Sequence, residues 1–370
     1  MTEREKSGTA AEPLRVVFCW SDISGYMAAC WRALSARSDV AVKVLAYGSS
    51  NATSFAHETM AGIDWHALEP GEHENIGQIA TLVAAHRPNV IVVPGWMNPT
   101  YKALAERAEF ARMRFIMTMD TPWRGDLRQR LARFALQRYL RRMDRVVVTG
   151  ERSFQYAVRL GVPEARIARG LYGVDCEELG RVAERRSEGP WPRRFLFAGR
   201  YAEEKALDVL VEAYRLYRAG AAEPFELVTC GQGELVQLLE GVEGISDHGF
   251  RQPSEMRDEL AAAGCFVMAS RFDPWPLALV EACAAGLPVV AASACGSAVE
   301  NVRDHVNGFI VATGDAEALA RALLAIDATY ARLPEFGVAS RNFAAAYSAE
   351  VWVRRWVEIL GTNPKWECEA

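Results

Sequence analysis

The sequence predicts an α/β protein built from two doubly wound domains in tandem. Its 370 residues are too many for one ordinary core and suit two domains of about 150 to 200 residues each. Short hydrophobic runs alternate with longer segments of helical period, which is typical of parallel sheets covered by helices on both faces. This alternation stops at a polar, Gly- and Pro-containing stretch, residues 173–191, and then starts again.

The first half supplies a domain that we expect to span residues 14–175. A segment of helical period beginning at Gly25 follows the first run. Residues 1–13 lack any apolar run, so a disordered N-terminus is expected. The strand candidates are LRVVFCW (14–20), VKVLAY (42–47), NVIVVPG (89–95), RFIMTMD (114–120) and DRVVVTG (144–150).

The second half repeats the pattern after a predicted linker, residues 176–192, which we expect to act as a hinge. The second domain is placed at residues 193–347, and a helical segment within 348–370 is expected to return toward the first domain. Two such domains would form a cleft between the carboxyl ends of their sheets, where ligands of these folds bind. The strand candidates are RRFLFAGR (193–200), FELVTCGQG (225–233), CFVMAS (265–270), LPVVAAS (287–293) and NGFIVA (307–312).

Composition excludes several classes of protein. A net charge of -5 gives no overall attraction to nucleic acid. The eight cysteines show no C-x-x-C pair and no zinc-ligand spacing, so they are expected to be reduced thiols in a cytoplasmic protein without a leader or a membrane-spanning segment. The six histidines show no catalytic arrangement: His57, His66, His73, His86, His248 and His305.

A candidate diphosphate site follows the strand FLFAGR. This strand ends at Gly199 and Arg200, and Lys205 comes near the start of the next helical segment. Fixed cations beside the unpaired N–H groups of a helix N-terminus favour a bound diphosphate. The alternative is that both are ordinary surface cations.

Two carboxylates, Asp273 and Glu281, mark a second cluster. A turn followed by a helix would direct both into one cleft, where carboxylate oxygens can hold sugar hydroxyls. Glu281 lies in the apolar segment LALVEACAAG, where an unpaired charge is costly. A ribose diol would satisfy this carboxylate, and so would a salt bridge to an arginine.

An ordered series of segments in the second half resembles a known family. GRYAEEKALDVLVEAYRLY, LVTCGQGEL, HGFRQPSEM and ASRFDPWPLALVEACAAGLPVVAASACGSAVENVRDHVNGFIV occur in this order. Over about residues 194–327 the chain is similar to the second domain of glycosyltransferase family 4. This resemblance implies the GT-B fold, two Rossmann-like domains around a cleft, and a retaining, metal-independent hexosyltransferase.

The resemblance also implies roles for residues of the donor site. Gly25, Gly199, Arg200 and Lys205 would surround the donor, with the two cations on its diphosphate. Glu281 would hold the ribose and Asp273 would face the transferred sugar. Backbone near Phe250 and Arg251 would contact the base.

Two positions depart from the family pattern. The first acid is Asp273 instead of Glu, and the glycine-rich stretch after it is replaced by Trp275, Pro276 and Leu277. Proline has no N–H to donate. Trp275 and Leu277 keep theirs, and the Trp275 ring is expected to stack on a sugar face. These departures leave open a non-catalytic, nucleotide-sugar-binding partner of another enzyme.

The first half resembles the family's acceptor domain through Ser24, Gly25 and Tyr26 and through the segment LGVPEARIARGLYGVD. Many relatives carry a histidine near the transferred sugar at the end of a middle strand. The matching segment FIMTMDTPW offers Asp120 instead. Asp120 is therefore predicted to face the sugar and joins Arg200, Lys205 and Asp273 as a candidate catalytic residue.

A basic segment, residues 124–145, carries eight arginines and two acids, with an apolar stripe at helical spacing. Two interpretations stay open. The stripe packs on the sheet beneath a solvated basic face, or the helix contacts anionic lipid at the inner membrane face or a polyanionic or lipid-diphosphate acceptor. Arg124 and Arg128, nearest the strand end, are the candidate acceptor-binding residues.

These observations predict an enzyme of polysaccharide or glycoconjugate biosynthesis. It would transfer a sugar from a nucleotide-diphosphate donor, UDP-sugar first and GDP-sugar second, to a glycan, lipid-linked or small-molecule hydroxyl. No metal or other cofactor is expected. A GT-B epimerase or phosphorylase shares the scaffold but fits the motif order less well. Gly231-Gln232-Gly233 lacks the third glycine of a dehydrogenase fingerprint and does not follow the first strand.

Overall fold

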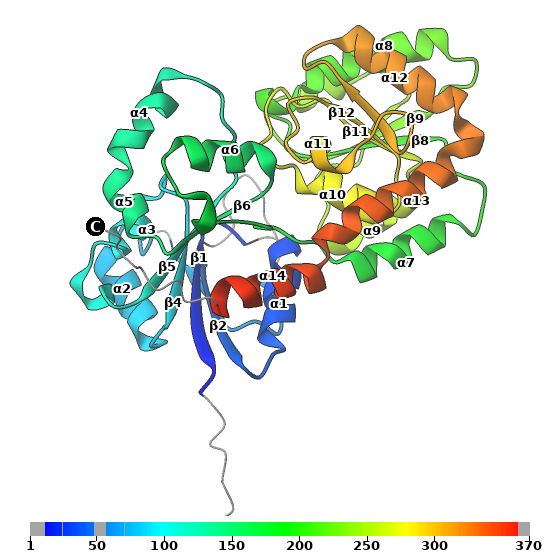
Figure 1. Cartoon of the computed structure of the whole chain (residues 1–370). Coiled ribbons are helices and arrows are strands. Elements are labelled where there is room, and N and C mark those ends of the chain that lie inside the picture. The colour runs from blue at the N-terminus through cyan, green and yellow to red at the C-terminus, as the bar shows by residue number, and fades with distance from the viewer. Residues whose placement is uncertain (1–11, 24, 48–56, 70, 362–370) are drawn as a thin grey trace, which may run out of the picture.

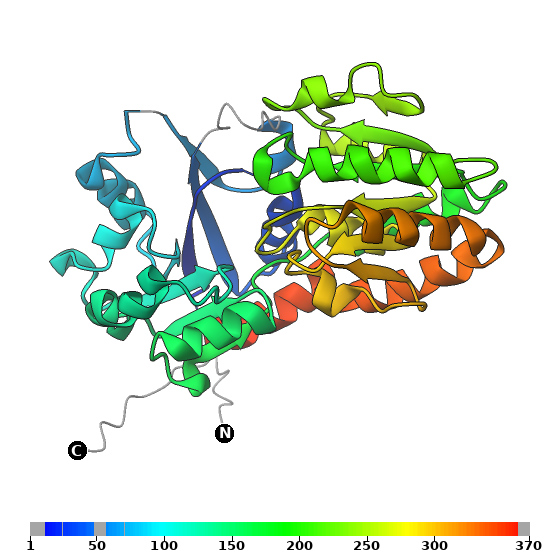
Figure 2. The ribbon, with the colours of Figure 1, turned by 90° about the horizontal axis from the view of Figure 1, so that it is seen from above.

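The computed structural model describes residues 12–23, 25–47, 57–69 and 71–361. Within them the chain forms two α/β domains that lie side by side, as Figures 1 and 2 show. Each domain contains one parallel sheet with helices on both faces. The fold class predicted from the sequence is confirmed. Of the residues 1–13 predicted to be disordered, residues 1–11 lie outside the described part of the chain.

The N-terminal sheet has seven parallel strands in the order β3-β2-β1-β4-β5-β6-β7. Its central strands are buried on both faces, which explains their continuous hydrophobic runs. The strands are β1 (Leu14–Trp20), β2 (Val40–Tyr47), β3 (Trp65–Leu68), β4 (Val90–Pro94), β5 (Arg114–Met119), β6 (Arg145–Val148) and β7 (Ile167–Arg169).

Helices cover both faces of this sheet and create two separate hydrophobic layers. One face carries α1 (Gly25–Ser35) and α14 (Ala349–Gly361). The other carries α2 (Ile76–Ala85), α3 (Pro99–Leu104), α5 (Gln137–Arg141) and α6 (Glu151–Arg159), with α4 (Leu127–Ala135) at the outer edge. Asn75, Asn98 and Asp126 each cap a helix by accepting a backbone N–H.

The C-terminal sheet has six parallel strands in the order β10-β9-β8-β11-β12-β13. They are β8 (Arg194–Ala198), β9 (Glu226–Cys230), β10 (Ile245–Asp247), β11 (Cys265–Met268), β12 (Val289–Ala292) and β13 (Gly308–Val311). Helices α8 (Leu207–Gly220) and α12 (Ala316–Ala328) cover one face. The other face carries α7 (Cys176–Arg186), α9 (Pro253–Ala262), α10 (Leu277–Ala284) and α11 (Ala298–Asn301), with the end of α13 (Leu333–Ala344).

The chain crosses between the domains twice, and the two crossings are hydrogen-bonded to each other. The Val174 N–H donates to the Tyr347 carbonyl at 2.8 Å, and the Ala349 N–H donates to the Val174 carbonyl at 3.0 Å. Beyond the second crossing, α14 packs Trp352 and Trp356 against Phe18 of the N-terminal domain. The last helix of the chain is therefore part of the first domain's core.

The predicted linker at residues 176–192 is wrong for most of its length. Residues 176–186 form α7, whose Leu179 and Val182 are buried in the C-terminal core. Asp175 caps this helix by accepting from the Glu178 N–H at 3.0 Å. A helix packed on a sheet cannot serve as the flexible hinge that was expected here.

The basic segment at residues 124–145 also differs from expectation. Its helix breaks at Leu136 into α4 and α5. Tyr139 is buried, but Leu127 and Leu131 are 72% and 56% exposed. The interpretation of one apolar stripe packed on the sheet is therefore wrong for α4.

The cysteines and the lengths of the helices can be compared with what the composition predicts. None of the seven cysteines among the described residues forms a disulfide, and all but Cys176 are buried. No helix in the described part of the chain has the length and apolar character needed to cross a membrane.

Candidate functional site

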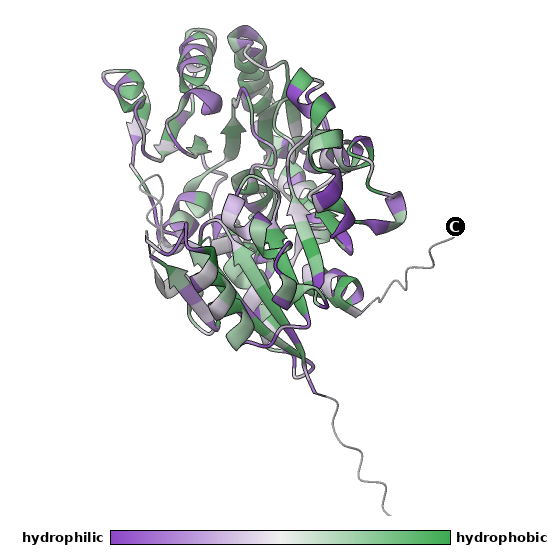
Figure 3. Cartoon of the chain, turned by 90° about the vertical axis from the view of Figure 1, so that its left-hand side faces the viewer, coloured by the Kyte–Doolittle hydropathy of each residue, from purple (hydrophilic) through white to green (hydrophobic). Residues whose placement is uncertain are grey.

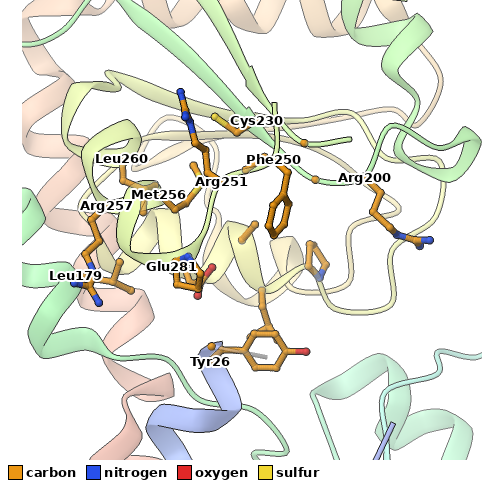
Figure 4. Close-up of a pocket in the computed structure, with 18 of the residues that line it drawn as sticks. Tyr26, Leu179, Arg200, Cys230, Phe250, Arg251, Met256, Arg257, Leu260 and Glu281 are labelled. Carbon is orange, nitrogen blue, oxygen red and sulfur yellow. The ribbon is translucent and has the colours of Figure 1, made fainter. Parts of the chain in front are cut away.

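A cavity of about 790 Å³ lies between the domains, at the carboxyl ends of both sheets. Figure 4 shows Arg200 at one end of it, Leu179 and Arg257 at the other, and Glu281 between them, above Tyr26 of α1. Every residue that the sequence analysis assigned to the donor lines this cavity: Gly25, Gly199, Arg200, Lys205, Phe250, Arg251, Asp273, Trp275, Pro276, Leu277 and Glu281.

Lys205 and Asp273 form an ion pair in the wall of the cavity. The Lys205 Nζ lies 2.5 Å from the Asp273 Oδ2, and their side chains are only 15% and 9% exposed. Lys205 ends a short 3₁₀ turn before α8, and Asp273 lies in the loop between β11 and α10. Two segments far apart in the sequence thus place a cation and a carboxylate together at the site.

Arg200 is the second cation at this end of the cavity. Its guanidinium lies 2.6 Å from the Glu204 carboxylate, and its side chain is 48% exposed. Such an exposed pair is weak and readily exchanged for another anion. Arg200 and Lys205 therefore offer two positive charges, each now held by a carboxylate that an incoming anion could replace.

Glu281 is a carboxyl group without a partner. It lies in the fifth position of α10, and no hydrogen bond or salt bridge to its side chain occurs among the described residues. Burial raises the pKa of Glu281 to about 7. The salt bridge to an arginine that the sequence left open is therefore absent, and the carboxyl group faces the cavity (Figure 4).

A polar cluster lies behind Phe250 and Arg251 at the end of β10. The Glu259 Oε1 accepts from the Arg251 Nε at 3.1 Å and lies 2.8 Å from the His248 Nδ1. Cys230, His248 and Glu259 bring possible metal-ligand atoms within 4.8 Å of one another. The Arg251 guanidinium already neutralises Glu259, and burial raises the Cys230 pKa to about 12, so this group does not suit a cation.

A second cavity, about 410 Å³, lies on the N-terminal side and is lined by Asp120. Asp22 and Tyr26 line both cavities, so the two adjoin. The Tyr172 hydroxyl donates to the Asp120 Oδ2 at 3.2 Å. Burial raises the pKa of Asp120, the Tyr172 hydrogen bond lowers it, and the Asp273 charge raises it further. The charge of Asp273, in the C-terminal domain, therefore acts on Asp120 in the N-terminal domain.

The Trp275 ring does not face the cavity as a stacking surface. It packs against Tyr347 with ring centroids 5.7 Å apart, and the residue is 7% exposed. A Cβ on Gly150 of the other domain would lie 2.5 Å from this ring. The expected ring stacking on a sugar is therefore wrong, and the Trp275 N–H donates to the Asp273 Oδ1 at 3.2 Å.

Arg124 and Arg128 lie outside both cavities. The Arg124 guanidinium stacks over the Phe272 ring of the C-terminal domain, 4.5 Å from its centroid. Arg128 is exposed on α4 and points one guanidinium nitrogen at the Met97 sulfur, 3.7 Å away. Neither arginine therefore lines the second cavity, and the structure gives no support for their predicted role as acceptor contacts.

Several lining residues carried no signal that the sequence analysis used. Asp22 follows β1, Gln232 follows β9, and Met256 and Arg257 lie on α9. Asp22 and Gln232 come directly after strands, a position that by itself predicts an approach to the cleft. Tyr172 precedes the first crossing, and its contact with Asp120 depends on tertiary structure alone.

Comparison with known families agrees with this geometry. Residues 192–327 match the family described as "Glycosyl transferases group 1", and residues 23–170 match the "Glycosyl transferase 4-like domain". These are the two halves around the cavity. The chain belongs to the glycosyltransferases of the GT4 type, with the GT-B fold.

Individual relatives are more distant. An amylovoran biosynthesis glycosyltransferase, AmsK of Erwinia amylovora, is 28% identical over 55% of this chain and 52% of its own length. A putative colanic acid biosynthesis glycosyltransferase of Escherichia coli, WcaL, is 30% identical over 45% of this chain and 43% of its own. The match thus spans about half the length of these curated relatives.

Solved structures show the same fold along nearly the whole chain. Anabaena HepE, crystallised with UDP and glucose, superimposes with a TM-score of 0.72 at 18% identity, over 94% of this chain and 99% of that one. Sucrose-phosphate synthase from Thermosynechococcus elongatus gives a TM-score of 0.71 at 17% identity over 94% and 98%. At these identities the likeness concerns the fold.

Proposed function

We propose that the chain is a retaining glycosyltransferase that moves a sugar from a nucleotide-diphosphate donor to an acceptor hydroxyl. The observation that carries this proposal is the unpartnered Glu281 carboxyl in a cavity that also holds Arg200 and Lys205. A ribose diol on the carboxylate and a diphosphate on the two cations would satisfy all three groups. UDP is the first candidate nucleotide and GDP the second.

The ion pair between Lys205 and Asp273 gives donor binding a mechanism. A diphosphate that takes Lys205 would release the Asp273 carboxylate from its 2.5 Å contact. The freed carboxylate then has oxygens available for hydroxyl groups of the transferred sugar. Arg200 and Lys205 would stabilise the charge that develops on the leaving diphosphate, which is the task a metal ion performs in other enzymes. The proposal therefore includes no metal.

The second cavity supplies the acceptor side. It adjoins the donor cavity at Asp22 and Tyr26, and Asp120 lies in it. An acceptor hydroxyl entering there would approach the sugar near Asp120 and Asp273. Retention of the anomeric configuration, and a glycan, lipid-linked or small-molecule acceptor, are parts of this proposal that follow from membership in the family.

Thermal unfolding with UDP, GDP, ADP and TDP in turn tests the donor site. A ligand at a hundred times its dissociation constant adds about 2.7 kcal/mol to the free energy of unfolding, which raises Tm by several degrees. We expect one nucleotide to raise Tm of the natural protein and of a Glu184→Gln control, an exposed residue on α7, but not of Glu281→Ala. No shift with any nucleotide at millimolar concentration would refute the donor site.

Turnover is the second part of the test. The sugar donors of the nucleotide that binds are offered with acceptors of the three classes, and the anomeric configuration of any product is read from its NMR coupling constants. Product with an inverted configuration would contradict retention. Binding without turnover across the whole set would instead favour a non-catalytic, nucleotide-sugar-binding partner. The physical reason for low activity would be that the Trp275 N–H already donates to Asp273 and is not available to the donor.

A further inference from the structure

Helix α4 is oriented with its apolar side toward solvent. Leu127, Leu131 and Phe134 are 72%, 56% and 75% exposed, whereas the polar Gln129 is 8% exposed. At about 100° per residue, these three apolar side chains lie within one narrow arc of the helix, and Gln129 lies on the opposite side. This is the reverse of the arrangement expected for a surface helix of a globular protein.

Polar contacts hold the helix in this orientation. The Gln129 side-chain amide donates to the Pro122 carbonyl at 2.9 Å and accepts from the Arg124 N–H at 2.6 Å. Asp126 caps the helix through the Gln129 N–H at 2.7 Å. The outward position of the apolar side chains is therefore fixed by the fold and does not come from loose packing.

The helices α4 and α5 also carry unpaired positive charge, and Arg128 and Arg130 flank the apolar arc. Five arginines of α4 and α5 are exposed, and within the described part of the chain none of them forms a salt bridge. By contrast, Arg181 pairs with Glu177 on α7 and Arg321 pairs with Glu317 on α12. The five arginines are Arg128, Arg130, Arg133, Arg138 and Arg141.

Met97 extends this surface toward the second cavity. It is 69% exposed, contacts Arg128 and lines the cavity that contains Asp120. Four of the eight large exposed hydrophobic side chains of the described chain, Met97, Leu127, Leu131 and Phe134, thus belong to one region. Figure 1 shows α4 at the outer edge of the N-terminal domain, away from the C-terminal domain, and Figure 3 shows this side of the molecule from the front, coloured by hydropathy.

We infer that these four apolar side chains and five arginines form a lipid-docking surface that binds an anionic bilayer. Apolar side chains on an interfacial helix enter the boundary between head groups and acyl chains, while flanking arginines contact the lipid phosphates. Nucleic acid would use the charges alone and leave Leu127, Leu131 and Phe134 in water. An anionic bilayer is the partner that uses both the charge and the apolar arc.

The docking has a consequence for the acceptor. With this surface on a bilayer, the cavity wall formed by Met97 lies next to the head groups. The acceptor of the proposed transfer would then be attached to a membrane lipid. This consequence rests on the proposed function, whereas the docking itself does not.

Sedimentation with sucrose-loaded vesicles tests the docking on the full chain. The vesicles are phosphatidylcholine alone or phosphatidylcholine with about one third phosphatidylglycerol, and no nucleotide or acceptor is added. We expect the natural protein to bind the anionic vesicles and not the neutral ones. Arg128→Gln with Arg130→Gln should weaken binding by about fivefold per arginine, and Leu127→Ser, Leu131→Ser and Phe134→Ser together should abolish it.

Matched controls carry the same kinds of change elsewhere on the surface. Val236→Ser with Val338→Ser removes two other exposed apolar side chains, 40% and 50% exposed, and Arg181→Gln with Arg321→Gln removes two other exposed arginines. These variants should bind vesicles like the natural protein, and all variants should keep its Tm because the altered side chains are exposed.

Three results would overturn the inference. The first is a folded natural protein that does not bind anionic vesicles. The second is an apolar triple variant that binds as well as the natural protein, since binding would then need only charge. The third is a dimer, measured by light scattering, that the triple variant dissociates, which would assign the surface to a second copy of the chain. Each result is independent of whether the protein binds a nucleotide.

Discussion

Replacing Glu281 by glutamine should make the free protein more stable at alkaline pH and change its stability little at acid pH. Burial raises the pKa of this carboxyl from 4.5 to about 7. An acid whose pKa is higher in the folded state binds protons more tightly there, so the folded protein loses stability as pH rises from the unfolded value through the folded one. Glutamine has nearly the same shape and does not titrate, so the variant lacks this loss.

The size of the effect follows from the two pKa values. One pKa unit corresponds to about 1.4 kcal/mol, so the full cost of ionising the buried carboxyl is about 3 kcal/mol. Between about pH 5 and about pH 8, the natural protein should lose about 2.5 kcal/mol of this, because ionisation of the unfolded state is incomplete at the lower pH. The stability difference between Glu281→Gln and the natural protein should grow by the same amount.

Urea unfolding at these two pH values measures this difference, with fluorescence and circular dichroism compared to check that the transition is shared. Glu184→Gln, on the exposed side of α7, is the control and should show the same stability difference at both pH values. A flat difference for Glu281→Gln, within about 0.5 kcal/mol, would mean that the carboxylate is solvated in the free protein. The argument that it awaits a ribose would then fail.

Two further changes test the packing of the site. Lys205→Ala should lower the free energy of unfolding by about 3 kcal/mol, because the Asp273 carboxylate then stays buried without its cation. Adding Asp273→Asn should restore most of this stability in urea unfolding without restoring nucleotide binding. If Lys205→Ala alone is as stable as the natural protein, the ion pair is solvated. Gly150→Ala should cost about 1 to 3 kcal/mol, because its Cβ would clash with the Glu300 Oε1 and lie 2.5 Å from the Trp275 ring. Gly180→Ala, with no atom within 4 Å on α7, should stabilise by up to about 1 kcal/mol. Equal effects of the two changes on urea unfolding would contradict the domain contact.

Most of the strands that the sequence predicted are buried on both faces, and the edge strand β13 is the exception. The ten hydrophobic runs correspond to β1, β2, β4, β5, β6, β8, β9, β11, β12 and β13. The three missed strands, β3, β7 and β10, are all sheet edges of three or four residues with partly exposed side chains. An edge strand needs no continuous apolar run, so the pattern used to find the others is absent there.

Helix α7 was missed although local signals for it exist. Asp175 is a capping residue, Glu177 and Glu178 follow in the first turn, and Arg185 and Arg186 end the helix. The polar composition suggested a linker because only one narrow side of the helix is apolar.

The orientation of α4 is a different case. Periodicity shows that a helix has an apolar side, but only the tertiary contacts of Gln129 determine that this side faces solvent.

The donor side of the site could be read from the sequence because strand ends and spacing place its residues. Arg200 follows β8, and Asp273 lies eight positions before Glu281, across the start of α10. The acceptor side could not be read in this way. The hydrogen bond of Tyr172 to Asp120 joins the crossing segment to the end of β5, and no local pattern records such a contact.

The proposed reacting groups lie where the two domains meet, so the domain contacts would influence the proposed chemistry directly. Asp120 and Asp273 come from different domains, and the charge of one raises the pKa of the other. Tyr172 donates to Asp120 within the N-terminal domain, so a rotation about the crossings would change the distance from Asp120 to Asp273 and leave this hydrogen bond in place. A bound donor would draw Lys205 away from Asp273. Domain closure would then increase the repulsion between the Asp120 and Asp273 carboxyl groups unless sugar hydroxyls lie between them. Under the proposed function, this arrangement would favour closure only when the sugar is present, which would protect the donor from transfer to water.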